Sequence, residues 1–353
     1  MKITYYGTGD GYGIPEPFCS CRLCSYARAH GGKDIRTRSQ ATVDDIMIDC
    51  SSDMFAHQAF YGLDMRKYRH ILITHGHSDH YAVSEMTARY QDPDTWHLYM
   101  PPALAEKEVA RMASIQAKNS KNPPNRTPVI HAMQPFETRE IGDYRVIALP
   151  SHHSPGTETL LYIVQHGGKT VFWVHDSGLL REDTIAYLRK SDFHFDAVSM
   201  DCTLARGSNF TSAHMDILQC RETADLLRDM GRIDERTVLL LSHIGHLIDR
   251  THDELSREAA ELGFIVAYDT MTLDILRLKP PLLGGQNGRF VIPLIRGERG
   301  RGHGCAGARD AAFAALAGRG FLAAVRFGAA GGGYPERLRY RPNAHRAAGE
   351  GSG

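Results

Sequence analysis

The sequence predicts an α/β fold of the α+β type in which two β-sheets pack between outer helices, a four-layer αββα sandwich. Two observations support this prediction. Short strand-like runs, helical stretches and loops alternate through the first 279 residues, and histidines or aspartates directly follow several of the strand-like runs. So many strands that end in residues typical of metal sites fit two stacked sheets better than a doubly wound parallel sheet.

The expected strands are short and rich in Val, Ile, Leu, Tyr or Phe, and Gly, Pro, Asp or Ser residues bound them. In chain order they are Lys2–Tyr6, Ile46–Asp49, His70–Thr74, His97–Met100, Tyr144–Leu149, Leu160–Gln165, Thr170–Val174, Ala197–Asp201, Val238–Ser242, Phe264–Tyr268 and Leu273–Leu278. The expected helices are Pro102–Ala117, Glu182–Lys190, His214–Met230 and Thr251–Leu262. The Pro- and Asn-rich stretch Asn119–Pro128 is expected to form a loop.

The composition changes after Pro280 and divides the chain into two parts. Residues 1–279 are expected to form the folded domain. Residues 280–353 form an extension rich in Gly, Ala and Arg, which we expect to be poorly ordered. From residue 284 onward the extension holds 11 Arg, no Lys and 4 acidic residues, a net charge of +7, and the rest of the chain carries −7. A mildly acidic body argues against a nucleic-acid partner.

The overall composition is that of an ordinary globular protein, with 42% apolar and 23% charged residues. The segment Met1–Tyr6 lacks the basic and apolar regions of a secretory signal, and no run of 18 apolar residues predicts a membrane span. Seven cysteines is an odd number, and three of them cluster in a pattern that suggests metal binding rather than disulfides. We therefore expect a cytoplasmic protein with no membrane partner.

The densest chemical signal is the segment Thr74–His80, which follows the apolar run His70–Ile73. His75 and His77 lie two residues apart on an extended segment and can converge on one metal ion. Asp79 and His80 follow at an expected helix start and point elsewhere, so they suit a second ion. The spacing therefore predicts two metal ions rather than one.

Three further signals follow expected strands: the pair His152 and His153, the segment with Asp176, and the segment with His243. Strand ends on one edge of a sandwich can gather such residues into one cleft. Imidazole and carboxylate ligands together suit Zn²⁺, Mn²⁺ or Fe.

A cysteine cluster near the N-terminus offers three thiolates, from Cys19, Cys21 and Cys24, within a Gly/Pro-rich loop. Three sulfurs lack one ligand for a tetrahedral structural zinc. His246 is the candidate for the fourth position. It lies three residues after His243, so one short turn would carry a residue of each site.

Together the HxHxDH motif, a later His, an Asp and a final His resemble the metallo-β-lactamase superfamily. The resemblance implies that His75, His77 and His153 hold a first ion, that Asp79, His80 and His243 hold a second, and that Asp176 bridges both. His152 is the alternative to His153. We prefer His153 because a Ser follows it, as in the family pattern.

With CxCxxC, the D-S-G segment, Met200-Asp201-Cys202 and the final HIxH added, residues 1–278 resemble the phosphodiesterase accessory proteins of the carbon–phosphorus lyase pathway. Those enzymes open phosphoribosyl 1,2-cyclic phosphate. The resemblance implies that His214, followed by Asp216, begins a helix and assists catalysis near the phosphate. The basic segment Gly31–Ser39 is a departure from the family, and we hypothesise that its Arg36 or Arg38 helps to bind a substrate phosphate.

The function expected from these signals is metal-dependent hydrolysis of a small phosphodiester, either cyclic or nucleotide-like. Two catalytic Zn or Mn ions would share a bridging hydroxide that attacks phosphorus. Asp79 would help to orient it, His214 would assist, and a third, structural Zn would bind the cysteines. Alternatives on the same scaffold are an acyl-ester or lactone hydrolase and a tRNA 3′-processing-type nuclease. A non-hydrolytic protein of the pyrroloquinoline-quinone B type is an alternative of another class, and the sequence leaves a homodimer open.

Overall fold

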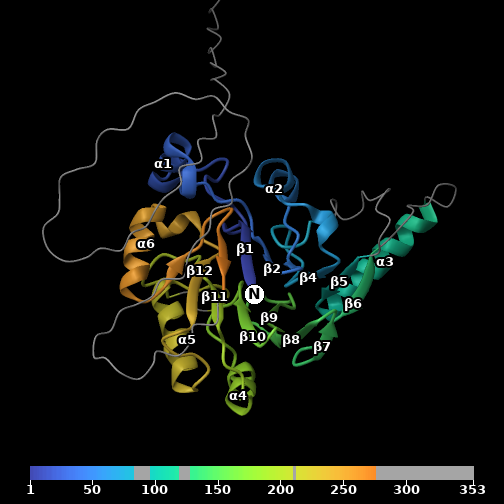
Figure 1. The fold of residues 1–353 in the computed structure, drawn as a ribbon. Coiled ribbons are helices and arrows are strands. Elements are labelled where there is room, and N and C mark those ends of the chain that lie inside the picture. The colour runs from blue at the N-terminus through green and yellow to red at the C-terminus, as the bar shows by residue number, and fades with distance from the viewer. Residues whose placement is uncertain (83–95, 119–127, 210–211, 276–353) are drawn as a thin grey trace, which may run out of the picture. The chain divides into compact units, whose positions relative to one another are not determined.

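Two seven-stranded sheets form the centre of the computed structural model of the protein, which describes residues 1–82, 96–118, 128–209 and 212–275 (Figure 1). The first sheet has the order β14 (Thr272–Asp274), β1 (Lys2–Gly7), β2 (Gln40–Val43), β3 (Ile46–Ile48), β4 (His70–Leu72), β5 (His97–Met100) and β6 (Val129–Ala132). The second has the order β13 (Ile265–Val266), β12 (Val238–Ser242), β11 (Ala197–Asp201), β10 (Lys169–Val174), β9 (Leu160–His166), β8 (Tyr144–Pro150) and β7 (Thr138–Ile141).

Three apolar cores hold the layers together. Between the sheets, Tyr5 of β1 stacks on Trp173 of β10 with ring centroids 5.6 Å apart, and both side chains are buried. The helices that pack on the second sheet are α1 (Arg22–His30), α4 (Glu182–Lys190), α5 (Ile217–Asp229) and α6 (His252–Glu261). Those that pack on the first sheet are α2 (Met54–Tyr61) and α3 (Pro102–Lys118). This arrangement confirms the predicted αββα sandwich.

Strand direction decides where the polar ends of the second sheet meet. Strands β10, β11, β12 and β13 are parallel, and β8 runs the same way because β9 is antiparallel to both β8 and β10. The carboxyl ends of β8, β10, β11 and β12 therefore lie at one edge of the sheet. Residues that are far apart in the sequence come together at this edge.

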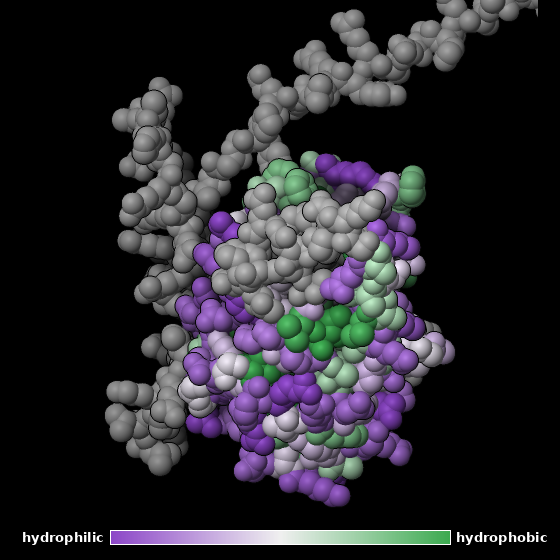
Figure 2. All heavy atoms as spheres, turned by 90° about the vertical axis from the view of Figure 1, so that its right-hand side faces the viewer, coloured by the Kyte–Doolittle hydropathy of each residue, from purple (hydrophilic) through white to green (hydrophobic). Residues whose placement is uncertain are grey.

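Helix α3 covers the outer face of the first sheet with few of its residues. Only Ala105, Glu108 and Met112 are buried among its 17 residues, and the charged side chains of Glu106, Lys107, Arg111 and Lys118 are among the others. Figure 2 views this side of the molecule, where hydrophilic residues surround a smaller hydrophobic area. No helix within the described ranges combines the length and the apolar character needed to span a membrane.

Each expected strand and helix overlaps an observed one, but the sequence reading missed five elements: β2, β6, β7, α1 and α2. The strands among them have four residues each, and β6 and β7 are edge-side strands with exposed positions. Helix α1 begins inside the cysteine cluster, where the pattern of thiols obscures a helical period. The expected loop at residues 119–128 lies almost entirely outside the described residues, as does all of 280–353.

The prediction that His214 begins a helix is wrong. Helix α5 begins at Ile217, and Asp216 is its N-cap. One Asp216 carboxylate oxygen accepts hydrogen bonds from the backbone N–H groups of Leu218 and Gln219, both at 2.9 Å. The Gln219 side chain accepts from the Asp216 N–H in return, which completes a capping box. His214 therefore lies in the loop before the helix, which this cap anchors.

We expect Asp216→Ala to lower the free energy of unfolding by about 1–2 kcal/mol, because it removes the N-cap of α5. Equilibrium urea unfolding would measure the change. Asp253→Ala, in the first turn of α6 but not at its cap, is the matched control and should change stability by less than about 0.5 kcal/mol. Equal stability of Asp216→Ala and the wild type would contradict the assignment of the cap.

Candidate metal centre

The segment after β4 brings two of its histidines together with a third from the loop after β8. The Nε2 of His75 lies 2.9 Å from the Nδ1 of His77, and the Nε2 of His153 lies 3.1 Å from that same Nδ1. All three nitrogens lie within 4.8 Å of one another. We call these three residues the first group. His152 lies outside this group and is exposed.

A second group lies beside the first and consists of Asp79, His80 and His243. The Nε2 atoms of His80 and His243 are 3.2 Å apart. The Oδ2 of Asp79 lies 3.1 Å from the first of these nitrogens and 3.7 Å from the second. The side chains of His80 and His243 are buried, and that of Asp79 is 12% exposed. A small ligand could therefore approach this group from the side of Asp79.

Asp176, at the end of β10, lies between the two groups. Its Oδ1 lies 3.8 Å from the Nε2 of His153, in the first group. Its Oδ2 lies 2.6 Å from the Nε2 of His80 and 3.2 Å from that of His243, in the second group. This Oδ2 is buried and accepts no hydrogen bond of normal geometry. A buried carboxylate oxygen without a donor, surrounded by ring nitrogens, fits a site for a cation.

Hydrogen bonds on the far side of the rings indicate which nitrogen is free for a ligand. The Nδ1 of His153 lies 3.2 Å from the carbonyl oxygen of Ala213, which can only accept, so this nitrogen carries the proton. The Nδ1 of His80 lies 2.7 Å from a carboxylate oxygen of Asp49 and is protonated for the same reason. In a neutral ring the Nε2 then keeps its lone pair, which is the arrangement of a metal-binding imidazole.

Two hydroxyl groups support the rings of His75 and His243. The Oγ1 of Thr74 lies 3.1 Å from the Nδ1 of His75 and donates to Asp49. The Oγ1 of Thr203 lies 2.9 Å from the Nδ1 of His243. Sequence reasoning missed Asp49, Thr74 and Thr203 as site residues. Asp49 lies at the end of an expected strand. The same kind of position pointed to Asp176, so a search for acidic residues at strand ends could have identified Asp49.

The electrostatics of the centre follow from buried carboxylates that face buried rings. Burial disfavours the charged form of His80, but the carboxylates of Asp176 and Asp79 outweigh it and raise the pKa of this ring well above its usual value. In His243 the same competition between burial and Asp176 raises the pKa to about 9. The carboxylates therefore favour positive charge at this position, and metal ions would supply such charge in place of protons.

His214 lies next to both groups. Its Nδ1 is 2.7 Å from Oδ2 of Asp201, at the end of β11, and 3.5 Å from Oδ1 of Asp176. Burial disfavours the charged ring, but Asp201 and Asp176 outweigh it and raise the pKa of His214. Its side chain is 21% exposed, whereas Asp201 is fully buried. Asp201 therefore orients a ring that solvent can reach.

The cysteine cluster is assembled at the same end of the molecule. The Nδ1 of His246 lies 3.3 Å from the Sγ of Cys19 and 3.8 Å from that of Cys21, and Cys24 completes a group whose ligand atoms lie within 4.8 Å of one another. Burial opposes the Cys21 thiolate, but the N–H of Cys24 and the His246 ring outweigh it and lower the pKa of Cys21 to about 7. We call these four residues the thiolate group. Its donor set suits zinc.

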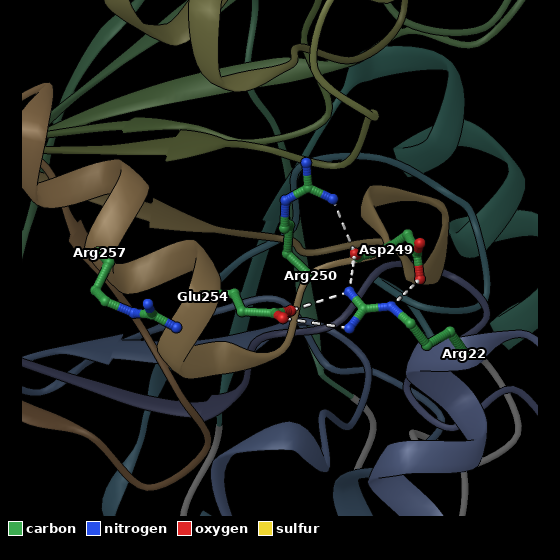
Figure 3. Close-up of a pocket in the computed structure, with 5 residues that line it drawn as sticks. All are labelled: Arg22, Asp249, Arg250, Glu254 and Arg257. Carbon is green, nitrogen blue, oxygen red and sulfur yellow. Dashed lines mark hydrogen bonds and ion pairs between the residues drawn. The ribbon is translucent and has the colours of Figure 1, made fainter.

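Arg22, within the cysteine motif, links α1 to the start of α6 by hydrogen bonds and ion pairs (Figure 3). Its guanidinium donates to Glu254 at 2.9 Å and to the Asp249 carboxylate at 3.2 Å, and also to the Asp249 carbonyl. Arg250 and Arg257 complete the lining of a hollow of about 370 Å³ on this side. These contacts hold α1 against the start of α6.

The two arginines expected to bind a phosphate are held by the protein itself. Arg36 is 3% exposed, and its guanidinium donates to Thr8 and to the Ala267 carbonyl. These contacts tie Arg36 to the protein interior, and a role for it in phosphate binding stays a prediction. The Arg38 guanidinium forms an ion pair with Asp53 at 2.9 Å and donates to the carbonyl of Gly11 at 3.0 Å.

Comparison with known proteins agrees with this fold and centre. The profile of the β-lactamase superfamily domain matches residues 44–244, more than half of the chain. The chain belongs to this superfamily. It has the metallo-β-lactamase fold, and the buried cluster of His and Asp residues indicates a metal-dependent hydrolase.

Several solved structures share the fold at low sequence identity. Zn²⁺-bound PqqB from Methylobacterium extorquens is 20% identical, with a TM-score of 0.59, over 78% of this chain and 100% of that one. A diphosphatase from the PhnP family is also 20% identical, with a TM-score of 0.59, over 77% and 97%. The short form of human tRNase Z is 17% identical, with a TM-score of 0.56, over 78% and 100%.

Among curated sequences, an octanoyltransferase from Porphyromonas gingivalis (strain ATCC BAA-308 / W83) is 35% identical over 85 residues. This match spans 23% of the chain and only 16% of the length of that relative.

We expect Asp176→Ala to lower the metal content from about three ions per chain to about one, because the shared carboxylate is lost from both groups. Elemental analysis of purified protein after dialysis would measure it, with a melting temperature as a check on folding. Cys21→Ser is the matched control: it should remove about one ion and leave two. An Asp176→Ala protein that keeps all its ions would show that this carboxylate binds none.

Proposed function

We propose that the protein hydrolyses phosphodiester bonds, with cyclic or nucleotide-like diesters as its substrates, by means of a dinuclear metal centre. The position of Asp176 supports this most strongly, because its two oxygens face different groups of imidazoles. A carboxylate placed in this way suits two ions about 3.5–4 Å apart, the spacing of centres that hydrolyse phosphate esters.

The chemistry of the side chains suits Zn or Mn at both catalytic positions and Zn at the thiolate group. The residues that would hold the catalytic ions, with Asp176 shared, are His75, His77 and His153 for the first and Asp79, His80 and His243 for the second. Such ions supply Lewis acidity and activate water for attack on phosphorus. The partly exposed carboxylate of Asp79 is placed to orient the attacking water.

His214 is the residue best placed to handle the leaving group. Asp201 holds its Nδ1, which fixes the ring and leaves Nε2 to face a ligand. A protonated ring in this position donates its proton to the leaving alkoxide, or stabilises the charge on the phosphoryl oxygens. An alkoxide leaving group needs a proton, whereas a phenolate leaves without one. An effect of His214 that depends on the leaving group would therefore distinguish this proposal from a two-metal esterase that has no general acid.

Two lines of support favour a phosphodiester over an acyl ester. The combination of the thiolate group, the HxHxDH motif and His214 resembles the phosphodiesterase accessory proteins of the carbon–phosphorus lyase pathway. A diphosphatase of the PhnP family also has this fold.

A substrate panel tests the proposed function directly. We expect Zn- or Mn-loaded protein to cleave bis(p-nitrophenyl) phosphate and a 2′,3′-cyclic nucleotide faster than p-nitrophenyl octanoate, a lactone or a precursor tRNA. Preference for the octanoate or the lactone would favour the acyl hydrolase, and preference for the precursor tRNA would favour the nuclease. A single bound catalytic ion with no turnover of any substrate would favour a non-hydrolytic role of the PqqB type.

We expect His214→Ala to lower kcat about 10²-fold or more for a diester with an alkyl leaving group, but less than about 10-fold with p-nitrophenolate. The reason is that p-nitrophenolate leaves without a proton. Steady-state kinetics on the two diesters would measure the difference. His194→Ala, on the surface near Asp234, is the matched control and should change neither rate. Equal losses on both diesters would rule out proton delivery by His214.

A further inference from the structure

The loop after β1 places one aromatic side chain beside the metal centre. Gly11 packs on Asp79 so closely that a β-carbon added to this glycine would lie 3.3 Å from the carboxylate Oδ2. The next residue, Tyr12, is 60% exposed. Its ring meets the ring of His246 edge to face, with centroids 6.0 Å apart and planes at 62°. One side of the phenol is therefore supported, and much of the remainder is open to solvent.

The loop is held in place by groups other than the Tyr12 side chain. The buried carboxylate of Asp10 accepts hydrogen bonds from the backbone N–H groups of Tyr12 and Gly13, both at 3.1 Å. Arg38 donates to the carbonyl of Gly11 at 3.0 Å and is itself paired with Asp53. Within the described part of the chain, the structure gives the Tyr12 hydroxyl no hydrogen bond. The backbone of the loop is thus held in place without the Tyr12 side chain, and the His246 ring supports the phenol on one side.

An exposed, already ordered aromatic ring is what stacking on a planar ligand requires, since binding then costs little conformational entropy. Leu247, which follows His246 in the chain, is also exposed, at 63%. The carboxylate that Gly11 contacts belongs to the second group, where the scissile phosphate would lie. Tyr12 directly follows Gly11, so it lies on the loop that borders this position.

We propose that Tyr12 is a specificity-determining residue that stacks on a nucleobase carried by the substrate. The inference rests on the proposed phosphodiesterase function and narrows its substrates to nucleotide-like diesters. The inference also assigns a role to the thiolate group, because His246 of that group supports the Tyr12 ring.

The test compares two diesters that share the p-nitrophenolate leaving group, the p-nitrophenyl esters of thymidine 5′-monophosphate and of methyl phosphate. Tyr12→Ala should lower kcat/KM about tenfold for the thymidine ester, mainly through KM, and less than about twofold for the methyl ester. Tyr12→Phe should behave as the wild type on both, because stacking needs the ring and not the hydroxyl. Phe18→Ala is the matched control, since Phe18 is 98% exposed on the same loop and should change neither value.

Equal losses on both diesters would show that Tyr12 only holds the loop, and no loss on either would overturn the proposal.

Calorimetric titration of the metal-loaded protein with adenosine 5′-monophosphate and with methyl phosphate separates this failure from failure of the proposed function. If the wild type cleaves neither diester, the proposed function fails, and the titration still decides the inference. Tyr12→Ala should weaken binding of the nucleotide about tenfold and leave methyl phosphate unchanged. Equal changes for both ligands, or none, would contradict it.

Discussion

One buried carboxylate, that of Asp176, has to serve two groups of imidazoles at once, and the arrangement of the sandwich follows from that requirement. Asp176 leaves β10 with a left-handed backbone, φ 49°, which turns the chain at the end of the strand. The neighbouring parallel strands end at the same edge and deliver Asp201 and His243. The opposite sheet contributes the histidines that follow β4. No single sheet could surround this carboxylate on both sides.

A second layer of polar side chains makes this burial tolerable. Buried rings and carboxylates are costly unless each has a partner, so the centre is enclosed by groups that orient it. Asp49 alone accepts hydrogen bonds from the backbone and hydroxyl of Thr74 and faces the ring of His80. Burial raises the pKa of Asp49, while the His80 ring and Thr74 act in the opposite direction. The free energy gained by burying the apolar cores thus offsets the cost of burying the charged groups of the site.

The parts of the site that the sequence made predictable are those with a local pattern or a strand end. His75, His77, Asp79 and His80 fall within six residues, and the loops with His153, Asp176 and His243 follow clear apolar strands. Thr203 and Asp10 are single polar residues, and only the packing of distant segments gives them a role. For the same reason α5 was predicted three residues too early, because the capping box that sets its start depends on the loop before it.

His243 and His246 belong to different centres but to the same short turn, and the loop after β1 pairs with Ile244, one of the two residues between them. Ile244 donates its N–H to the carbonyl of Thr8 at 2.8 Å and accepts from the N–H of Asp10 at 3.3 Å. Gly245 packs so tightly between Asp10 and Thr203 that a β-carbon there would lie within 3 Å of both. A shift of His246 is therefore also a shift of His243. In thermodynamic terms this shared turn is the route by which the sulfur-rich and the nitrogen-rich centres can influence each other, and any such coupling acts equally in both directions.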